Sequence, residues 1–237
     1  MVARIFIIAS VACVFSIANG LSDPFPGFKP CKTDDEDCVL QNAKNGIESF
    51  VNGIPEYGVE PMDPEFFKRV DSSSPSLKFI LSNVTSTGLK TCKAVKVTRN
   101  RASSQLNIVL KCALNLDGNY ELNGRILIID IVGKGKIHVK LPEVINTVKC
   151  NYIIKDGKDG KKHLRIKNFV HDFELTQKST VIFEGLFPDN DVLRQATLEV
   201  VKHNGNEIVE EIGKPMFTAS VTRVIEKLNK FFGIIPY

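Results

Sequence analysis

The side chains best able to do chemistry are scattered along this sequence. The four histidines, His138, His163, His171 and His203, stand far apart, and each is expected to be a surface or edge residue. We find no G-x-S-x-G, no H-E-x-x-H and no histidine and cysteine at a recognisable spacing. The sequence therefore predicts no catalytic residue, no metal site and no cofactor, and it indicates that the protein is not an enzyme.

Two lysine-rich segments resemble anion-binding sites in their composition. Gly133-Lys134-Gly135-Lys136 lacks the spacing of a phosphate-binding loop and the helix that should follow it, so a bend between strands is favoured. The cluster at 155–162 contains two Asp-Gly steps, its lysines are diluted by aspartates, and no aromatic residue interleaves. It is typical of a solvated hairpin tip, and we expect no nucleic-acid partner.

The first twenty residues have the pattern of a secretory signal peptide. Arg4 precedes an apolar run over 5–18 that is too short to span a bilayer, and Ala18 and Gly20 are small residues before a cut ahead of Leu21. No later stretch has the apolar length of a membrane span. We therefore expect a secreted, extracellular protein without integral membrane association, in which residues 21–237 form one domain.

Secretion makes disulfides and glycosylation possible. Cys31 and Cys38 flank a short acidic loop and are the best disulfide candidates among the five cysteines that remain after the signal. Because five is odd, at least one of them is free or paired outside the chain. Asn83-Val84-Thr85 fits the N-glycosylation pattern, which predicts a modification site at Asn83.

Cys92 and Cys112 lie on neighbouring predicted strands, at equal distance from position 102. A symmetric register would set them opposite each other. The apolar alternation opposes that register, because Val95 and Val97 should share a face with the apolar residues at 106, 108 and 110. We therefore favour buried free thiols for this pair.

Strand patterns dominate the middle of the chain. After an extended arm over 21–30, a helix is predicted after Asp37 and ends at Gly53, and the proline-dense segment 54–64 is expected to lie along a surface groove. Short turns between strands predict an antiparallel meander. Alternation is clean from 106 to 114 but is lost at 126–129, where both faces look covered. The predicted strands are 77–84, 88–98, 106–116, 125–132, 136–141, 146–155, 164–167 and 180–183.

The C-terminal stretch, from about Asn190 to Tyr237, predicts a long apolar helix. Gly205 and the Gly213-Lys214-Pro215 run should kink or break it. Its apolar side chains cover much of its circumference, so the strand-rich middle must cover it on more than one side. The fold class is α+β, with the helix either filling the concavity of a curved sheet or enclosing an elongated cavity with it.

The order and spacing of several motifs resemble the takeout/juvenile hormone-binding protein family of insects, across essentially the whole mature chain. These motifs are Cys31 and Cys38, 53–64 (GIPEYGVEPMDP), 83–89 (NVTSTGL), 116–120 (LDGNY), 133–135 (GKG), Leu186-Phe187 and 235–237 (IPY). The resemblance implies a tubular lipid-binding fold, a curved antiparallel sheet wrapped around the C-terminal helix. It also implies a tunnel for a terpenoid hormone, fatty-acid derivative or similar ligand.

Two departures favour the takeout-like branch over the hormone-binding branch. The hormone-binding branch carries a second disulfide in its C-terminal half, and this chain has no cysteine after Cys150. Cys150 also falls where that branch carries a tyrosine facing the hormone, although Tyr152 lies two positions on. A tyrosine packed in the wall remains the alternative reading of Tyr152.

The resulting prediction is a monomeric haemolymph carrier of a small hydrophobic ligand, without catalysis, which meets a receptor or another carrier protein. The alternative is a membrane-surface or protein-interaction module with a filled tunnel, although the sequence lacks a strong basic amphipathic helix. Each candidate residue of the tunnel wall could equally be ordinary core. These candidates are Leu106, Ile108, Leu110, Leu114, Ile128, Phe183, Phe217 and Val221, with Tyr152 as the polar contact.

Overall fold

A computed structural model describes residues 29, 31–32 and 35–236, so the expected signal peptide lies outside the described residues. The first helix, α1 (Glu36–Asn52), begins where the Asp35 carboxylate accepts the backbone N–H of Cys38 at 2.9 Å. It ends at Gly53, whose φ of 88° suits glycine, as the sequence predicted. Cys31 and Cys38 form the predicted disulfide at its start.

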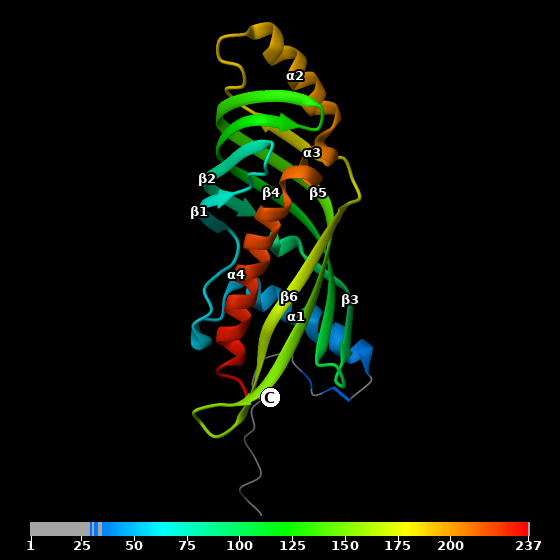
Figure 1. The fold of residues 1–237 in the computed structure, drawn as a ribbon. Helices are drawn as coiled ribbons and strands as arrows, with labels where there is room; N and C mark the ends of the chain where they lie inside the picture. The colour runs from blue at the N-terminus through cyan, green and yellow to red at the C-terminus, as the bar shows by residue number, and fades with distance from the viewer. Residues whose placement is uncertain (1–28, 30, 33–34, 237) are drawn as a thin grey trace, which may run out of the picture.

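One curved antiparallel sheet forms most of the molecule (Figure 1). Its order is β1-β2-β4-β5-β6, with β3 beside β4 and β7 beside β5. Each of the long strands β4 and β5 therefore holds two shorter partners end to end along one edge. The strands are β1 (Glu65–Asp71), β2 (Leu77–Thr87), β3 (Lys93–Asn100), β4 (Gln105–Ile126), β5 (Ile129–Asp156), β6 (Lys162–Leu175) and β7 (Thr180–Phe183).

The long strand β5 replaces three shorter predicted ones. The bend expected at 133–136 is wrong, because β5 runs through these residues. Position 133 requires glycine, since the Tyr120 hydroxyl and the Leu186 side chain occupy the space that a Cβ would need. Pro142 lies at a register shift, between the Leu114–Leu141 and Cys112–Val144 pairs, where a missing N–H breaks no ladder bond. The prediction of a covered strand at 126–129 was wrong, because residues 127 and 128 form the turn between β4 and β5.

The expectation of free thiols at Cys92 and Cys112 was also wrong, because the two form a disulfide. Near the cysteines the register is the symmetric one, with Lys93 opposite Lys111. The register shifts by one residue at Val95, which is 52% exposed, and the alternation used in the sequence argument holds only beyond that bulge. A single bulged residue therefore returns both cysteines to one face.

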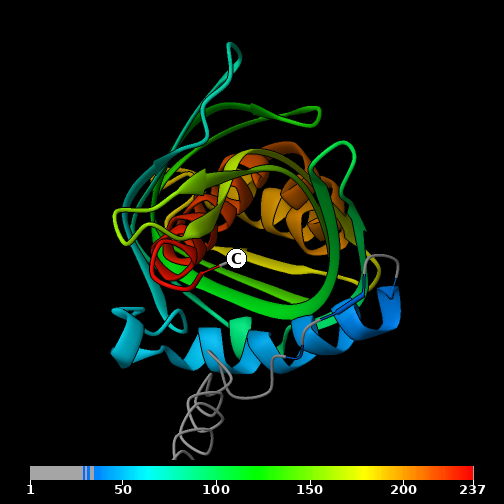
Figure 2. The same cartoon turned by 90° about the horizontal axis from the view of Figure 1, so that it is seen from below.

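The C-terminal stretch breaks where predicted, into α2 (Asp191–His203), α3 (Gly205–Ile212) and α4 (Lys214–Phe232). A Cβ on Gly205 would lie 2.3 Å from the Ser179 carbonyl oxygen, so this approach of α3 to the segment before β7 requires glycine. Viewed along the long axis, the sheet curves around α3 and α4, while α1 lies across the open side (Figure 2).

The predicted groove segment 54–64 packs between α1 and the end of α4. Its first residues include the short 3₁₀ turn η1 (Pro55–Tyr57). Ile54, Val59 and Met62 are buried with Phe50 of α1 and Phe231 of α4 in one cluster. The Phe50 and Phe231 rings meet edge to face with centroids 4.7 Å apart. This segment therefore couples α1 to the C-terminal helix.

Candidate functional site

An elongated cavity of about 760 Å³ lies between the concave face of the sheet and helices α3 and α4. Its volume is within the range of small-molecule sites, and its wall is predominantly aliphatic. Lining residues extend along β4 from Leu106 to Leu116, ten steps that span about 33 Å in an extended strand. The long dimension of the cavity therefore follows β4.

The alternation read from β4 correctly places its even-numbered residues on the cavity wall. Leu106, Ile108, Leu110 and Leu114 all line the cavity, as the sequence predicted. They are only partly buried, because one side of each faces the cavity instead of packed neighbours. Helix α4 contributes the other two correctly placed residues, and these are Phe217 and Val221.

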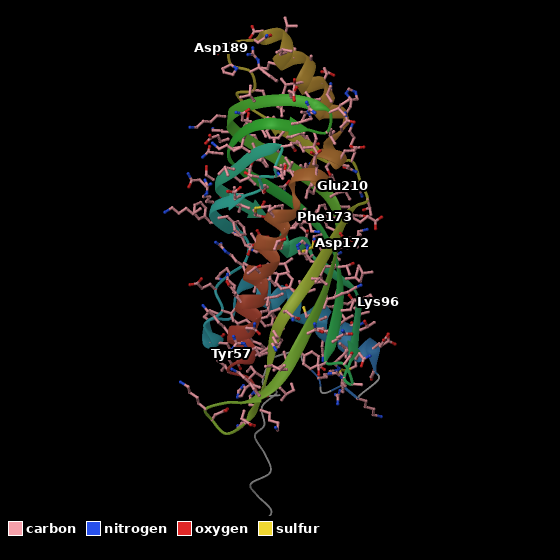
Figure 3. The ribbon with its side chains drawn as sticks, viewed as in Figure 1. Tyr57, Lys96, Asp172, Phe173, Asp189 and Glu210 are labelled. Atoms are coloured by element: carbon pink, nitrogen blue, oxygen red, sulfur yellow. A yellow bond between two sulfur atoms is a disulfide. The ribbon has the colours of Figure 1, made fainter. Side chains whose placement is uncertain are left out.

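The Phe217 ring marks the point where α4 approaches β6. It stacks on Phe173 of β6 with ring centroids 4.1 Å apart and an interplanar angle of 20°. Phe173 lies beside α4 in the side-chain view (Figure 3). The pair therefore closes the gap between helix and sheet while leaving one face of Phe217 to the cavity.

Three predicted wall residues lie elsewhere. Ile128 is 93% exposed at the turn between β4 and β5, because the apolar run that contains it bends there. Phe183 is buried in the core, where its ring meets Tyr120 edge to face with centroids 5.0 Å apart. Tyr152 is buried outside the cavity lining, and its backbone N–H donates to the Ser104 carbonyl at 2.9 Å. Tyr152 therefore does not supply the predicted polar contact.

Polar groups that the sequence argument missed interrupt the apolar wall. Asn146 of β5 is buried opposite Leu110, and its Oδ1 has no hydrogen-bond partner among the described residues. Ser220 of α4 also lines the cavity and donates its hydroxyl to Glu65 Oε2 at 2.6 Å. Burial raises the pKa of Glu65, which favours its protonated form. The inward parity of residue 146, between Val144 and Val148, is the signal that could have revealed Asn146.

The end of the cavity near the β3–β4 turn is basic. Among the described residues, the charged side chains that line the cavity are Lys29, Arg99 and Arg101. Lys29, Arg101 and Pro236 are exposed, so the cavity meets solvent at this end. The free thiol of Cys150 also lines the cavity here, and burial raises its pKa to about 11.

The histidines occupy separate places and do not form a site. His138 and His203 lie at the surface and His163 lies on the edge strand β6, as expected, although the His163 side chain is only 3% exposed. Among residues 29, 31–32 and 35–236, no group of histidine, cysteine and acidic side chains is arranged to hold a metal ion. Within the same residues, no helix combines the length and apolar character required to cross a membrane.

The comparisons with known proteins agree on one family. The chain is 27% identical over 240 residues to the circadian clock-controlled protein daywake of Drosophila melanogaster, which covers 96% of this chain and 90% of daywake. It is 26% identical over 157 residues to a juvenile hormone-binding protein of Manduca sexta, covering 62% and 64% of the two chains.

The fold is that of a solved takeout protein. The crystal structure of Epiphyas postvittana Takeout 1 matches with a TM-score of 0.81 at 24% identity, covering 87% of this chain and 95% of that one. The family model described as haemolymph juvenile hormone binding protein matches residues 8–237. The chain therefore belongs to the haemolymph juvenile hormone binding protein family.

Proposed function

We propose that this protein is a secreted carrier that binds one small hydrophobic, lipid-like ligand in its cavity and performs no catalysis on it. The observation that carries the proposal is the elongated apolar cavity between the sheet and the helices α3 and α4. Apolar ligand surface that leaves water gains roughly 25 cal/mol per Å². A cavity that follows about ten residues of β4 provides such burial for a long, narrow molecule.

Family membership supports the same ligand class. The Manduca sexta relative is named for binding juvenile hormone, so a terpenoid hormone or a fatty-acid derivative is the class of ligand proposed here. The absence of catalysis is proposed because no nucleophile on the described cavity wall is paired with an effective base. The Cys150 thiol has a raised pKa, and no histidine lines the cavity among the described residues. The Ser220 hydroxyl donates to Glu65, whose raised pKa favours the protonated form.

Secretion is part of the proposal. Disulfides such as Cys31–Cys38 and Cys92–Cys112 form and persist in oxidising compartments. Cleavage ahead of Leu21 would leave the described residues intact. Amino-terminal sequencing of the protein collected from the medium of insect cells tests this step, and a retained Met1 would contradict it.

The decisive experiment is native mass spectrometry of the protein purified from secreted fluid, repeated after organic extraction. The proposal expects an added mass that disappears on extraction and a protein that then binds a fluorescent fatty-acid probe. The extract identifies the ligand class. A protein that carries no adduct and does not bind the probe would contradict the carrier function and would favour a membrane-surface or protein-interaction module.

A further inference from the structure

The charges on the cavity wall are of one sign. Lys29, Arg99 and Arg101 line one end, and no aspartate or glutamate lines the cavity anywhere in the described part of the chain. None of the three forms an ion pair with another described residue. A partly buried cation beside an apolar cavity is stabilised by an anionic partner, and within the described protein the half-buried Arg99 has none.

The backbone holds these cations at one level of the cavity. Arg99 of β3 pairs with Leu106 of β4, and Leu106 pairs with Cys150 of β5, so the three form one rung across the wall. Arg101 follows in the turn after β3. The Lys29 backbone is fastened to Asn42 of α1 by two hydrogen bonds, of 3.0 and 2.7 Å. Arg99, Arg101 and Lys29 therefore lie together at the solvent-facing end of the cavity.

Arg99 retains unused hydrogen-bonding capacity. One terminal nitrogen, Nη2, reaches the Lys32 carbonyl oxygen at a long 3.4 Å, while Nε is buried and has no partner among the described residues. A guanidinium group binds a carboxylate or phosphate through two parallel N–H donors, and such charge-assisted bonds are about twice as strong as neutral ones. The unpaired Nε is the kind of donor that such an oxyanion satisfies.

We propose that the ligand is a single-chain lipid anion whose carboxylate or phosphate head binds Arg99, Arg101 and Lys29 while its apolar chain extends along β4. This inference rests on the proposed carrier function and specifies the ligand's chemistry and orientation. The head faces solvent at the basic end, and the chain tail points toward the buried residues Val181 and Ile208. A neutral ester of the same chain length lacks the anion and loses this contact.

The test is displacement of the uncharged fluorescent probe N-phenyl-1-naphthylamine by palmitate, hexadecyl phosphate and methyl palmitate. At least one of the two anions should bind the wild-type protein about tenfold more tightly than the methyl ester, as charge-assisted hydrogen bonds predict. A preference for only one anion supports the inference and identifies the head group. Equal affinities for all three competitors would overturn it and leave the carrier function standing.

Substitutions of the arginines test where the anionic head group binds. Arg99→Gln/Arg101→Gln should reduce the anion affinity about tenfold or more and leave methyl palmitate binding unchanged, which also reports that the variant is folded. Lys93→Gln/Lys96→Gln is the matched control, since both lysines are exposed on the same strand, outside the cavity, and Lys96 is labelled in Figure 3.

Arg101→Gln alone changes an exposed turn residue and should give a several-fold loss. An anion preference that survives the double variant would overturn the inference. If neither the probe nor any competitor binds the wild-type protein, the carrier function fails and the inference fails with it.

Discussion

The imidazole of His163 joins the β5–β6 hairpin to the end of the C-terminal helix. Its Nδ1 lies 3.0 Å from the Phe232 carbonyl oxygen, and its Nε2 lies 2.9 Å from Asp159 Oδ1. Both neighbours are acceptors, so only the protonated ring donates to both. Hydrogen bonds to Asp159 and to the Phe232 carbonyl raise the pKa of His163 above its usual 6.5.

This arrangement predicts a loss of stability as pH rises. The contribution of His163 is fully present below its unfolded pKa of about 6.5 and is lost as pH increases through the raised pKa of the folded state. Thermal melting of the wild type and of His163→Gln between pH 5.5 and 8.5 measures it. The difference in Tm should be largest at acidic pH, and a constant difference would contradict the prediction. His138, whose pKa is raised by Asp117, is present in both proteins and cancels in the comparison.

Cys150 is predicted to react slowly with alkylating reagents. The thiolate is the nucleophile, and a pKa of about 11 leaves a thiolate fraction at pH 8 two to three orders of magnitude below that of an ordinary cysteine. Labelling by iodoacetamide should accelerate about tenfold per pH unit up to that value. A bound ligand should slow it further, because Cys150 lines the cavity. Urea-unfolded protein is the control, and rapid labelling of the native, ligand-free chain would rule out this burial.

Phe217→Trp should narrow the cavity and weaken the binding of long ligands while the fold is retained. The larger ring disturbs the stack on Phe173, and overpacking of this kind costs about 1–3 kcal/mol of stability. The natural chain contains no tryptophan, so the variant gains a single fluorescent reporter. Ile128→Trp, at the exposed turn, is the control and should bind normally. Unchanged affinity in Phe217→Trp would remove Phe217 from the binding residues.

Replacing Asn146 by leucine should stabilise the ligand-free protein. The buried Oδ1 has no partner among the described residues, and such an unsatisfied group costs about 1–3 kcal/mol. In the wild type, a stearate that carries a mid-chain hydroxyl is expected to donate this hydroxyl to the Oδ1 of Asn146 and so to bind more tightly than stearate. Asn146→Leu should abolish that advantage. Asn107→Leu also removes a buried oxygen that has no partner within the described part of the chain. Asn107 lies outside the cavity lining, so this change should alter stability alone. Urea unfolding and probe displacement separate the two effects.

The Cys92–Cys112 disulfide should be the more stabilising of the two. It closes 20 residues where Cys31–Cys38 closes 7, which in a chain-entropy model corresponds to about 3 and about 2 kcal/mol. Urea unfolding of Cys92→Ser/Cys112→Ser and of Cys31→Ser/Cys38→Ser measures both. Equal midpoints for the wild type and the first variant would contradict this expectation.

The sequence predicts what depends on local periodicity. The even-numbered residues of β4 face the cavity because the strand period of two is obeyed there, and the break before Pro215 follows from the chemistry of glycine and proline. It does not predict where the period slips. One bulged residue, Val95, reverses the facing of Cys92 relative to the strand beyond it.

Two further residues were not placed correctly from the sequence because their positions depend on partners that are distant in the chain. Ile128 belongs to an apolar run, and only the pairing of β4 with β5 shows that the chain turns there. Arg99 is an ordinary surface residue by composition, and it joins the cavity wall only because its strand pairs with Leu106. Both outcomes are decided by long-range register, which a local pattern does not contain.

The end-to-end placement of β2 and β3 along β4 gives the two ends of the cavity different supporting strands. Arg99 belongs to β3, whereas Phe79 and Leu81, farther along the cavity, belong to β2. Both strands pair with β4. Substitutions that reshape one half of the tube therefore leave the hydrogen-bonded neighbours of the other half in place. A chimera that exchanges β2 between relatives should change the accepted chain while keeping the head-group selectivity, which makes the scaffold suited to combinatorial redesign.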